Sequence, residues 1–191
     1  MNDIFALELS WILDDAKRAW CAMLLNLLPD AFYQKPASSS GKYHPQYSLG
    51  EGGLARHVRG AVLIARNLLP LDMYSGFTEN QRDNIICALL LHDGMKYGED
   101  GDSHTVFSHP LDMVDWLRKQ EWRSYISEAD FNEICDAVGT HMGQWTTSKY
   151  SDAVLPAPET DMQKFVHLCD YLASRRFLEV DFDRIETPEY S

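Results

Sequence analysis

The stretch ALLLHDGMK, residues 88–96, changes character at its centre. A run of apolar residues leads directly into the adjacent His92 and Asp93, Gly94 follows, and Lys96 lies three residues after the aspartate. The apolar run followed by glycine predicts a buried helix that ends at this pair. An imidazole and a carboxylate at the end of a buried helix need partners, and these must come from other parts of the chain.

Helical periodicity dominates the rest of the sequence. Apolar residues recur at three- and four-residue spacing over 3–28, where Pro29 ends the first predicted helix. Thr78 and Ser127 are predicted N-caps of two later helices. No alternating strand pattern, internal repeat or low-complexity tract is evident. We therefore predict an all-α, single-domain helical bundle with further helices over 54–69, 78–91, 109–120, 127–141 and 159–178.

Two segments flank the predicted core of helices. Residues 30–53 are rich in Ser, Gly and Pro but also carry three tyrosines and a phenylalanine, which favours an ordered irregular loop packed on the body. Residues 179–191 are predicted to be a frayed tail. The predicted organisation is thus an N-terminal helix over 1–29, the loop over 30–53, a core over 54–178 and the tail.

The composition restricts the classes of partner. Lys plus Arg is 17 and Asp plus Glu is 29, giving a formal charge of −12. Binding of long nucleic acid needs clustered basic residues, so none is expected, and a phosphate site in this chain would need bound cations. No apolar run approaches the ~18 residues of a membrane span, and the N-terminus lacks the basic region of a signal peptide. A cytoplasmic protein without a membrane partner is expected, and the aromatic-rich first helix offers a face for a homo-oligomer.

The four cysteines also favour a cytoplasmic location. None lies in a CxxC pair, and each falls within an apolar helical pattern, where a thiol behaves as a small hydrophobe. We interpret them as reduced core residues in a reducing compartment. The cysteines are Cys21, Cys87, Cys135 and Cys169.

Several histidines fall at the ends of predicted helices. His57 lies in a first turn, His92 and His141 end helices, and His109 begins one. Such positions can converge at one end of a helical bundle, where histidine and carboxylate ligands can hold divalent metals. Asp170 lies in the apolar segment FVHLCDYLASRRF, residues 165–177, and an ionised carboxylate there needs a cation. That cation is either a metal ion or the guanidinium of Arg175 or Arg176.

Taken together, these residues resemble the HD-domain metal-dependent phosphohydrolase superfamily, whose motif order is H…HD…D on an all-α bundle. In this chain the order is His57, then His92 and Asp93, then Asp170. The flanking segments GLARHV, ALLLHD and VHLCDYLASRR are also similar, and the resemblance extends over 53–177. An HD dipeptide alone is a weak signal, whereas the ordered set with apolar helices leading into it is specific.

Two additional histidines resemble the pattern of members that bind two metals. His109, in FSHPLDMVDWL, and His141, in VGTHMGQW, lie between the HD pair and the last aspartate. His104 lies five residues before His109 and is the alternative, but the family pattern puts this ligand at the start of a helix. Lys96 matches the HDxxK variant found in binuclear members, whereas mononuclear 5′-deoxynucleotidases usually have Glu there.

The resemblance implies a phosphohydrolase or phosphodiesterase that uses metal-activated water on a nucleotide or short oligonucleotide. Asp93 would bridge two divalent ions, Mn²⁺, Fe²⁺, Co²⁺ or Ni²⁺ with Mg²⁺ also compatible, and Lys96 would act on a phosphate oxygen. Alternatives are a deoxynucleotide triphosphohydrolase or 5′-nucleotidase, and a non-catalytic nucleotide-sensing HD module. The implied metal ligands are His57, His92, Asp93, His109, His141 and Asp170.

Two segments close to these ligands are candidates for substrate binding. Lys42 and His44 lie in the segment that leads into the His57 helix, and Gln144 and Trp145 closely follow His141. These four residues are predicted to contact substrate, although packing of the loops on the bundle would also explain them. His167 shares a helical side with Asp170 and is expected to bond to a ligand or to lie in the core.

Overall fold

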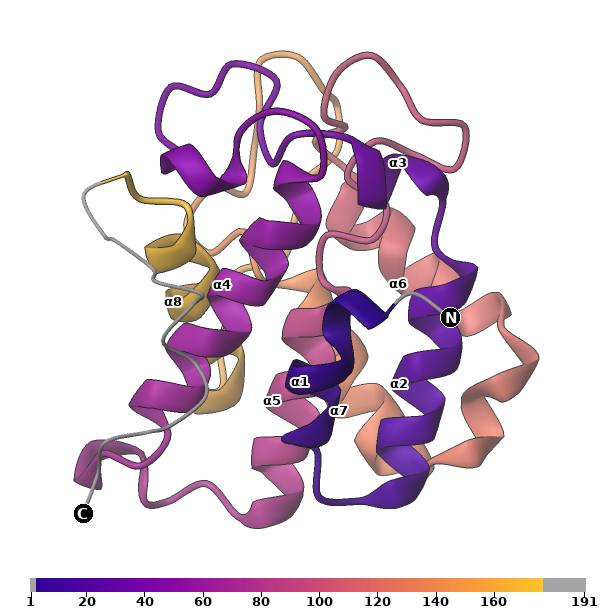
Figure 1. Cartoon of the computed structure of the whole chain (residues 1–191), viewed down its shortest axis with the longest axis vertical. Helices are drawn as coiled ribbons and strands as arrows, with labels where there is room; N and C mark the ends of the chain where they lie inside the picture. Colours follow the sequence, from indigo (N-terminus) through magenta and orange to yellow (C-terminus); the bar gives the residue numbers. More distant parts are fainter. Residues whose placement is uncertain (1–2, 177–191) are drawn as a thin grey trace.

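A computed structural model describes residues 3–176 (Figure 1). This part of the chain is all-helical and forms one domain, which confirms the predicted fold class. The predicted tail over 179–191 and the last two residues of the helix predicted over 159–178 lie outside the described residues. The α-helices are α1 (Ala6–Ser10), α2 (Asp15–Leu27), α3 (Asp30–Gln34), α4 (Gly53–Leu68), α5 (Glu79–Leu91), α6 (His109–Lys119), α7 (Glu128–Gly139) and α8 (Asp161–Ala173). The short 3₁₀ helices are η1 (Asp3–Phe5), η2 (Gln46–Ser48), η3 (Asp72–Tyr74) and η4 (Glu121–Tyr125).

Helix α5 is the centre of the bundle. It packs against α2, α4, α7 and α8, and every residue over 85–91 is buried. Thr78 caps its first turn in a reciprocal hydrogen-bonded box with Gln81, as the sequence predicted for the cap residue. The apolar run that precedes His92 is therefore a buried helix, as expected.

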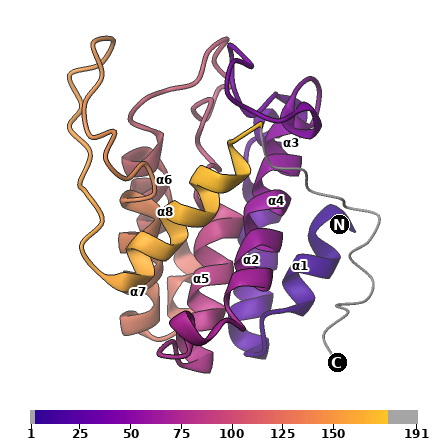
Figure 2. The same ribbon diagram turned by 90° about the vertical axis from the view of Figure 1, so that its left-hand side faces the viewer.

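The termini of several helices gather at one end of the bundle. We call the end at which α4 and α6 begin and α5, α7 and α8 end the loop end of the bundle. Figures 1 and 2 show the connections after α3, α5 and α7 gathered there, at the top of both views. The residues singled out by the sequence at helix termini thus lie at one end of the molecule.

The prediction of one continuous helix over 3–28 is wrong. The chain breaks between α1 and α2, because the Asp83 carboxylate of α5 accepts the backbone N–H groups of Leu13 and Asp14 at 2.9 and 2.8 Å. Asp14 then caps α2 by accepting the N–H of Lys17 at 2.9 Å. An apolar period can continue across such a break, since both pieces face the same core.

The segment over 30–53 is less irregular than predicted, because it contains α3 and η2. Arg56 of α4 anchors its last part by donating hydrogen bonds to the carbonyl oxygens of Tyr47 and Leu49.

All four cysteines are buried and unpaired, as predicted. No helix of the described part is both long and apolar enough to cross a bilayer.

Candidate metal centre

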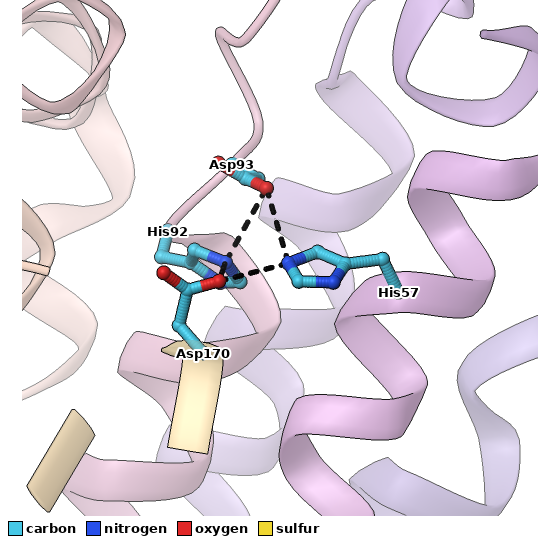
Figure 3. Close-up of side chains that lie close together, drawn as sticks. All are labelled: His57, His92, Asp93 and Asp170. Atoms are coloured by element: carbon cyan, nitrogen blue, oxygen red, sulfur yellow. Dashed lines mark hydrogen bonds and ion pairs between the residues drawn. The ribbon is translucent and has the colours of Figure 1, made fainter. Parts of the chain in front are cut away.

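Four side chains meet where α5 ends at the loop end. His57 reaches in from the second turn of α4, Asp170 from the last turn of α8, and His92 and Asp93 from the end of α5 (Figure 3). His57 Nε2 lies 2.9 Å from Asp170 Oδ1 and 3.5 Å from Asp93 Oδ2. His92 Nε2 lies 3.4 Å from Asp93 Oδ2 and 3.5 Å from Asp170 Oδ1. These four residues form the first ligand group.

A second group uses the other oxygen of Asp93. His109 Nε2, at the start of α6, lies 3.1 Å from Asp93 Oδ1, and His141 Nε2, just after α7, lies 3.6 Å from the same oxygen. The two imidazole Nε2 atoms are 3.1 Å apart. Asp93 therefore presents one carboxylate oxygen to each group. This geometry is the one that a bridging ligand requires.

Backbone carbonyl groups orient three of the imidazole rings. The Nδ1 atoms of His92, His109 and His141 lie 2.7, 2.6 and 2.7 Å from the carbonyl oxygens of residues three positions earlier. A carbonyl oxygen only accepts, so each Nδ1 carries the proton and donates it. In the neutral ring the lone pair is then on Nε2, which faces the centre. Metal-ligating histidines are commonly held in this way.

The donor atoms fit divalent ions. Two ligand atoms that each lie about 2.1 Å from one ion are roughly 3.0–3.4 Å apart at angles between 90° and tetrahedral. The separations between imidazole Nε2 atoms and carboxylate oxygens run from 2.9 to 3.6 Å, and all ligand atoms of each group lie within 4.8 Å of one another. His92 Nε2 and Asp93 Oδ1 are buried and have no hydrogen-bond partner. The side chains of this chain therefore suit one ion in each group.

Opposite charges compensate one another within the metal-free centre. Burial alone would raise the pKa of Asp93, but the Lys96 ammonium, which donates to Asp93 Oδ2 at 2.6 Å, and the His92 ring hold it well below its ordinary value. Burial would lower the pKa of His92, but Asp93 and Asp170 raise it to about 10. The pKa of His141 falls to about 4, mainly through burial. Without an ion, the positive charge of the centre thus comes from Lys96 and a protonated His92.

His109, rather than the alternative His104, belongs to this cluster. His104 is exposed and its ring bonds to Ser103 Oγ. His167 contacts the centre indirectly: its Nδ1 donates to the carbonyl oxygen of His141 at 2.7 Å. The structure therefore brings together all six residues predicted as ligands. His167 hydrogen-bonds to the backbone of one of them, His141.

The four predicted substrate contacts lie around the centre rather than in it. His44 packs its ring 5.4 Å from that of His57, neither of its nitrogens has a hydrogen-bond partner, and burial lowers its pKa to about 3. Lys42 and Gln144 are exposed. Trp145 is 42% exposed and stacks on Tyr171.

One functional position was not recognised in the sequence. Gly143 has φ +64°, and a Cβ added there would lie 2.2 Å from the His167 ring. The glycine allows the loop after α7 to pass close to His167. The sequence signal that could have indicated this role is the position of the glycine, two residues after the candidate ligand His141.

A hollow of the described surface lies away from this centre. It has a volume of about 670 Å³ and is lined by residues of η3 and by the first turns of α5 and α8, at the opposite end of α8 from Asp170. None of the six candidate ligands lines this hollow.

Comparison with known proteins gives one match. The model of the HD domain family matches residues 54–175, a range that contains all six candidate ligands. No curated protein and no solved structure matches the chain.

Proposed function

The chain belongs to the HD domain family, and from this premise we propose that it is a metal-dependent phosphohydrolase or phosphodiesterase. The proposed substrate is a nucleotide or short oligonucleotide, in which a phosphoester or phosphoanhydride bond is hydrolysed. One observation carries the proposal: Asp93 directs Oδ2 toward His57 and His92 and Oδ1 toward His109 and His141. This arrangement favours two ions that share one carboxylate.

The proposed ion sites follow the two ligand groups. His57, His92, Asp93 and Asp170 would hold one ion, and Asp93, His109 and His141 would hold the other. When bound, a divalent ion would supply a Lewis acid for the phosphoryl oxygens and lower the pKa of a water molecule. Imidazole and carboxylate ligands suit Mn²⁺, Fe²⁺, Co²⁺ or Ni²⁺.

Other side chains would bind and orient the substrate. The ammonium of Lys96 lies at the edge of the centre and can donate to a phosphate oxygen while it remains close to Asp93. We propose that Lys42, His44, Gln144 and Trp145 contact the rest of the substrate from the two loops beside the centre. The buried, unpaired cysteines support a reducing, cytoplasmic location for the reaction.

Metal content of wild type and three variants tests the proposal. Wild type purified without chelator and supplied with Mn²⁺ should hold about two ions per chain, Asp93→Ala none and His141→Ala about one. His104→Ala is the matched control, since His104 is an exposed histidine outside the cluster, and it should hold two. A wild type that takes up no Mn²⁺, Fe²⁺, Co²⁺ or Ni²⁺ would falsify the proposal.

The products of hydrolysis then separate the alternatives. Release of a nucleoside monophosphate from an oligonucleotide indicates a phosphodiesterase, and release of inorganic phosphate indicates a nucleotidase. Release of triphosphate from a deoxynucleoside triphosphate indicates a triphosphohydrolase. A chain that holds metal and binds nucleotide but yields none of these products is a sensing module.

A further inference from the structure

A continuous stack of aromatic and cationic side chains borders the metal centre. The indole of Trp145 lies nearly parallel to the Tyr171 ring, with centroids 5.7 Å apart and an interplanar angle of 16°. The guanidinium carbon of Arg175 lies 4.4 Å from the centroid of Tyr171 and 5.6 Å from that of Tyr43. We call these four residues, Trp145, Tyr171, Arg175 and Tyr43, the rim stack.

Each part of the rim stack is tied to a candidate ligand. Tyr171 directly follows Asp170, and Tyr43 directly precedes His44, whose ring packs on His57. The backbone N–H of Arg176 donates to the carbonyl oxygen of Tyr43 at 2.9 Å, which joins the end of α8 to the loop before α4. Figure 2 shows these two segments side by side at the loop end. The rim stack therefore lies where a substrate held at the metals would extend.

Arg175 has no acidic partner among the residues described. Within residues 3–176, its guanidinium donates only to Ser174 Oγ, from Nε at 3.1 Å and from Nη2 at 2.8 Å. A guanidinium has five N–H donors, so several remain for an anion. Cation–π contacts with the Tyr171 and Tyr43 rings hold the guanidinium in place.

Trp145 offers a surface for an aromatic ring. Tyr171 covers one side of the indole and His167 meets it at an angle of 66°, yet the residue remains 42% exposed. A tryptophan already held by such contacts loses little conformational freedom when a base stacks on it. Aromatic side chains of this kind bind bases of any sequence through their π faces.

We propose that the rim stack binds the part of the substrate that lies away from the bond being hydrolysed. Trp145 stacks on a nucleobase, and Arg175 binds a second phosphate, one not held by the metals. This inference rests on the proposed function and makes its substrate more specific: a compound with a base and at least two phosphates. Both a nucleoside diphosphate and a phosphorylated dinucleotide have this chemistry.

The experiment is calorimetric titration of the Mn²⁺-loaded full chain with four probes. Two probes have a base and two phosphorus groups: α,β-methylene ADP, and a 5′-phosphorylated diadenosine dinucleotide with a phosphorothioate linkage. AMP lacks the second phosphate, and methylenediphosphonate lacks the base. Wild type should bind the first two more tightly than either of the others, and the tighter of the two identifies the mononucleotide or oligonucleotide source.

Substitutions test separately whether Trp145 binds the base and whether Arg175 binds the second phosphate. Trp145→Leu should weaken binding of the base-containing probes about tenfold and leave methylenediphosphonate unaffected. Arg175→Gln should weaken the probes with two phosphorus groups and leave AMP unaffected, while Arg175→Lys, which keeps the charge but not the planar donors, should lose part of that affinity. Trp122→Leu and Arg123→Gln are matched controls on η4, beyond the far end of α6 from His109, and should bind as wild type does.

Two patterns overturn the inference. If Trp145→Leu weakens base-free and base-containing probes equally, or weakens neither, the indole does not bind a base. If Arg175→Gln affects AMP as much as the methylene analogue, Arg175 only stabilises the end of α8, where a cation is favourable in any case. A wild type that shows the expected probe and variant pattern but hydrolyses neither a phosphoester nor a phosphoanhydride contradicts the proposed function and leaves the rim stack supported as a binding site.

Discussion

Asp93 is the residue on which the centre depends. It is fully buried, and its two oxygens face four imidazole rings and one ammonium group. A buried carboxylate is stable only when cations or donors compensate it. In the metal-free chain a proton on His92 takes part of that role, so an incoming ion has to replace the proton. Metal binding at this centre would therefore be an exchange of cations.

This exchange predicts a pH dependence. The pKa of His92 is raised to about 10, so at pH 7 the ring is protonated in the metal-free chain and must lose that proton to bind an ion. Uptake of Mn²⁺ should release about one proton from this ring, and the apparent affinity should rise about tenfold per pH unit between pH 6 and 8. Calorimetry in buffers of different ionisation enthalpy measures the release. His104→Ala should behave as wild type does, and binding without proton release would contradict this account of His92.

The positions of the six candidate ligands could be predicted because each lies at a recognisable point of the sequence. His92 and Asp93 follow an apolar helix, and His109 and His141 lie at the two ends of others. Arg175 could not be assigned in this way. The sequence offered it, together with Arg176, as a possible cation for Asp170, whereas the structure places its guanidinium beside Tyr43, far earlier in the chain. Contacts between remote loops are not encoded in local pattern.

At the scale of elements, α5 supports the centre. The segment over 85–91 is buried on every side, and it delivers His92 and Asp93 at its last turn. A helix with no solvent face has no room for rearrangement, because protein interiors are closely packed. Its packing should therefore contribute both to stability and to the position of the two ligands.

Truncating a side chain in α5 should be costly. Leu89 is fully buried, so Leu89→Ala should lower the free energy of unfolding by about 2–5 kcal/mol through lost burial and the cavity left behind. Urea unfolding monitored by circular dichroism measures the change. Leu71→Ala is the control, since Leu71 is 46% exposed, and a surface substitution should change stability by no more than about 0.5 kcal/mol. Equal losses in the two variants would show that α5 is not the core of the bundle.

The loop after α7 depends on Gly143. Its positive φ and the His167 ring, 2.2 Å from an added Cβ, leave no space for a side chain. Gly143→Ala should cost at least about 1 kcal/mol of stability and displace His167 from the carbonyl oxygen of His141. Metal content should then fall toward one ion per chain. Gly76→Ala is the matched control, because a Cβ there meets nothing within 4 Å. Full metal content and unchanged stability in Gly143→Ala would refute this role.

The break between α1 and α2 shows what periodicity cannot reveal. The apolar spacing over 3–28 continues through the break, but Asp83, some seventy residues later, accepts the N–H groups that a continuous helix would use. Aspartate favours the N-cap position as threonine does, so the consecutive Asp14 and Asp15 indicated a helix start in the same way that Thr78 correctly indicated the start of α5. The identity of the partner that completes the break depends on tertiary packing.

The whole molecule has a polar cluster at each end of its core. At the end opposite the metal centre, the buried ammonium of Lys17 donates to the side-chain oxygens of Asn80 and Asn84 at 2.6 and 2.7 Å and lies 3.1 Å from Asp130 Oδ1. Asn84 also donates to Glu133 at 2.6 Å. This second cluster joins α2, α5 and α7. Because these partners come from three helices, it holds the bundle together independently of any metal.

The second cluster should make stability depend on pH through Asp130. Burial would raise the pKa of this carboxyl group, but hydrogen bonds from Ser127, Asn84, Asn80 and Lys17 lower it. The folded chain then holds fewer protons on Asp130 than the unfolded chain, so its contribution is present above the unfolded pKa of about 3.9 and is lost as the pH falls below that value. Asp130→Asn should therefore lower the free energy of unfolding by about 1–3 kcal/mol at pH 7.

That difference should decrease as the pH falls below about 4, since the unfolded chain then binds a proton at Asp130 while the folded chain keeps the carboxylate ionised, and this proton uptake favours unfolding of wild type. Urea unfolding at pH 7, 5, 4 and 3 gives the difference between the two proteins at each pH. Asp136→Asn is the matched control on the same helix, because the Asp136 side chain is exposed, and it should change stability by no more than about 0.5 kcal/mol at any pH. A loss in Asp130→Asn that stayed constant down to pH 3 would mean that the shape of the residue, rather than its charge, joins the three helices.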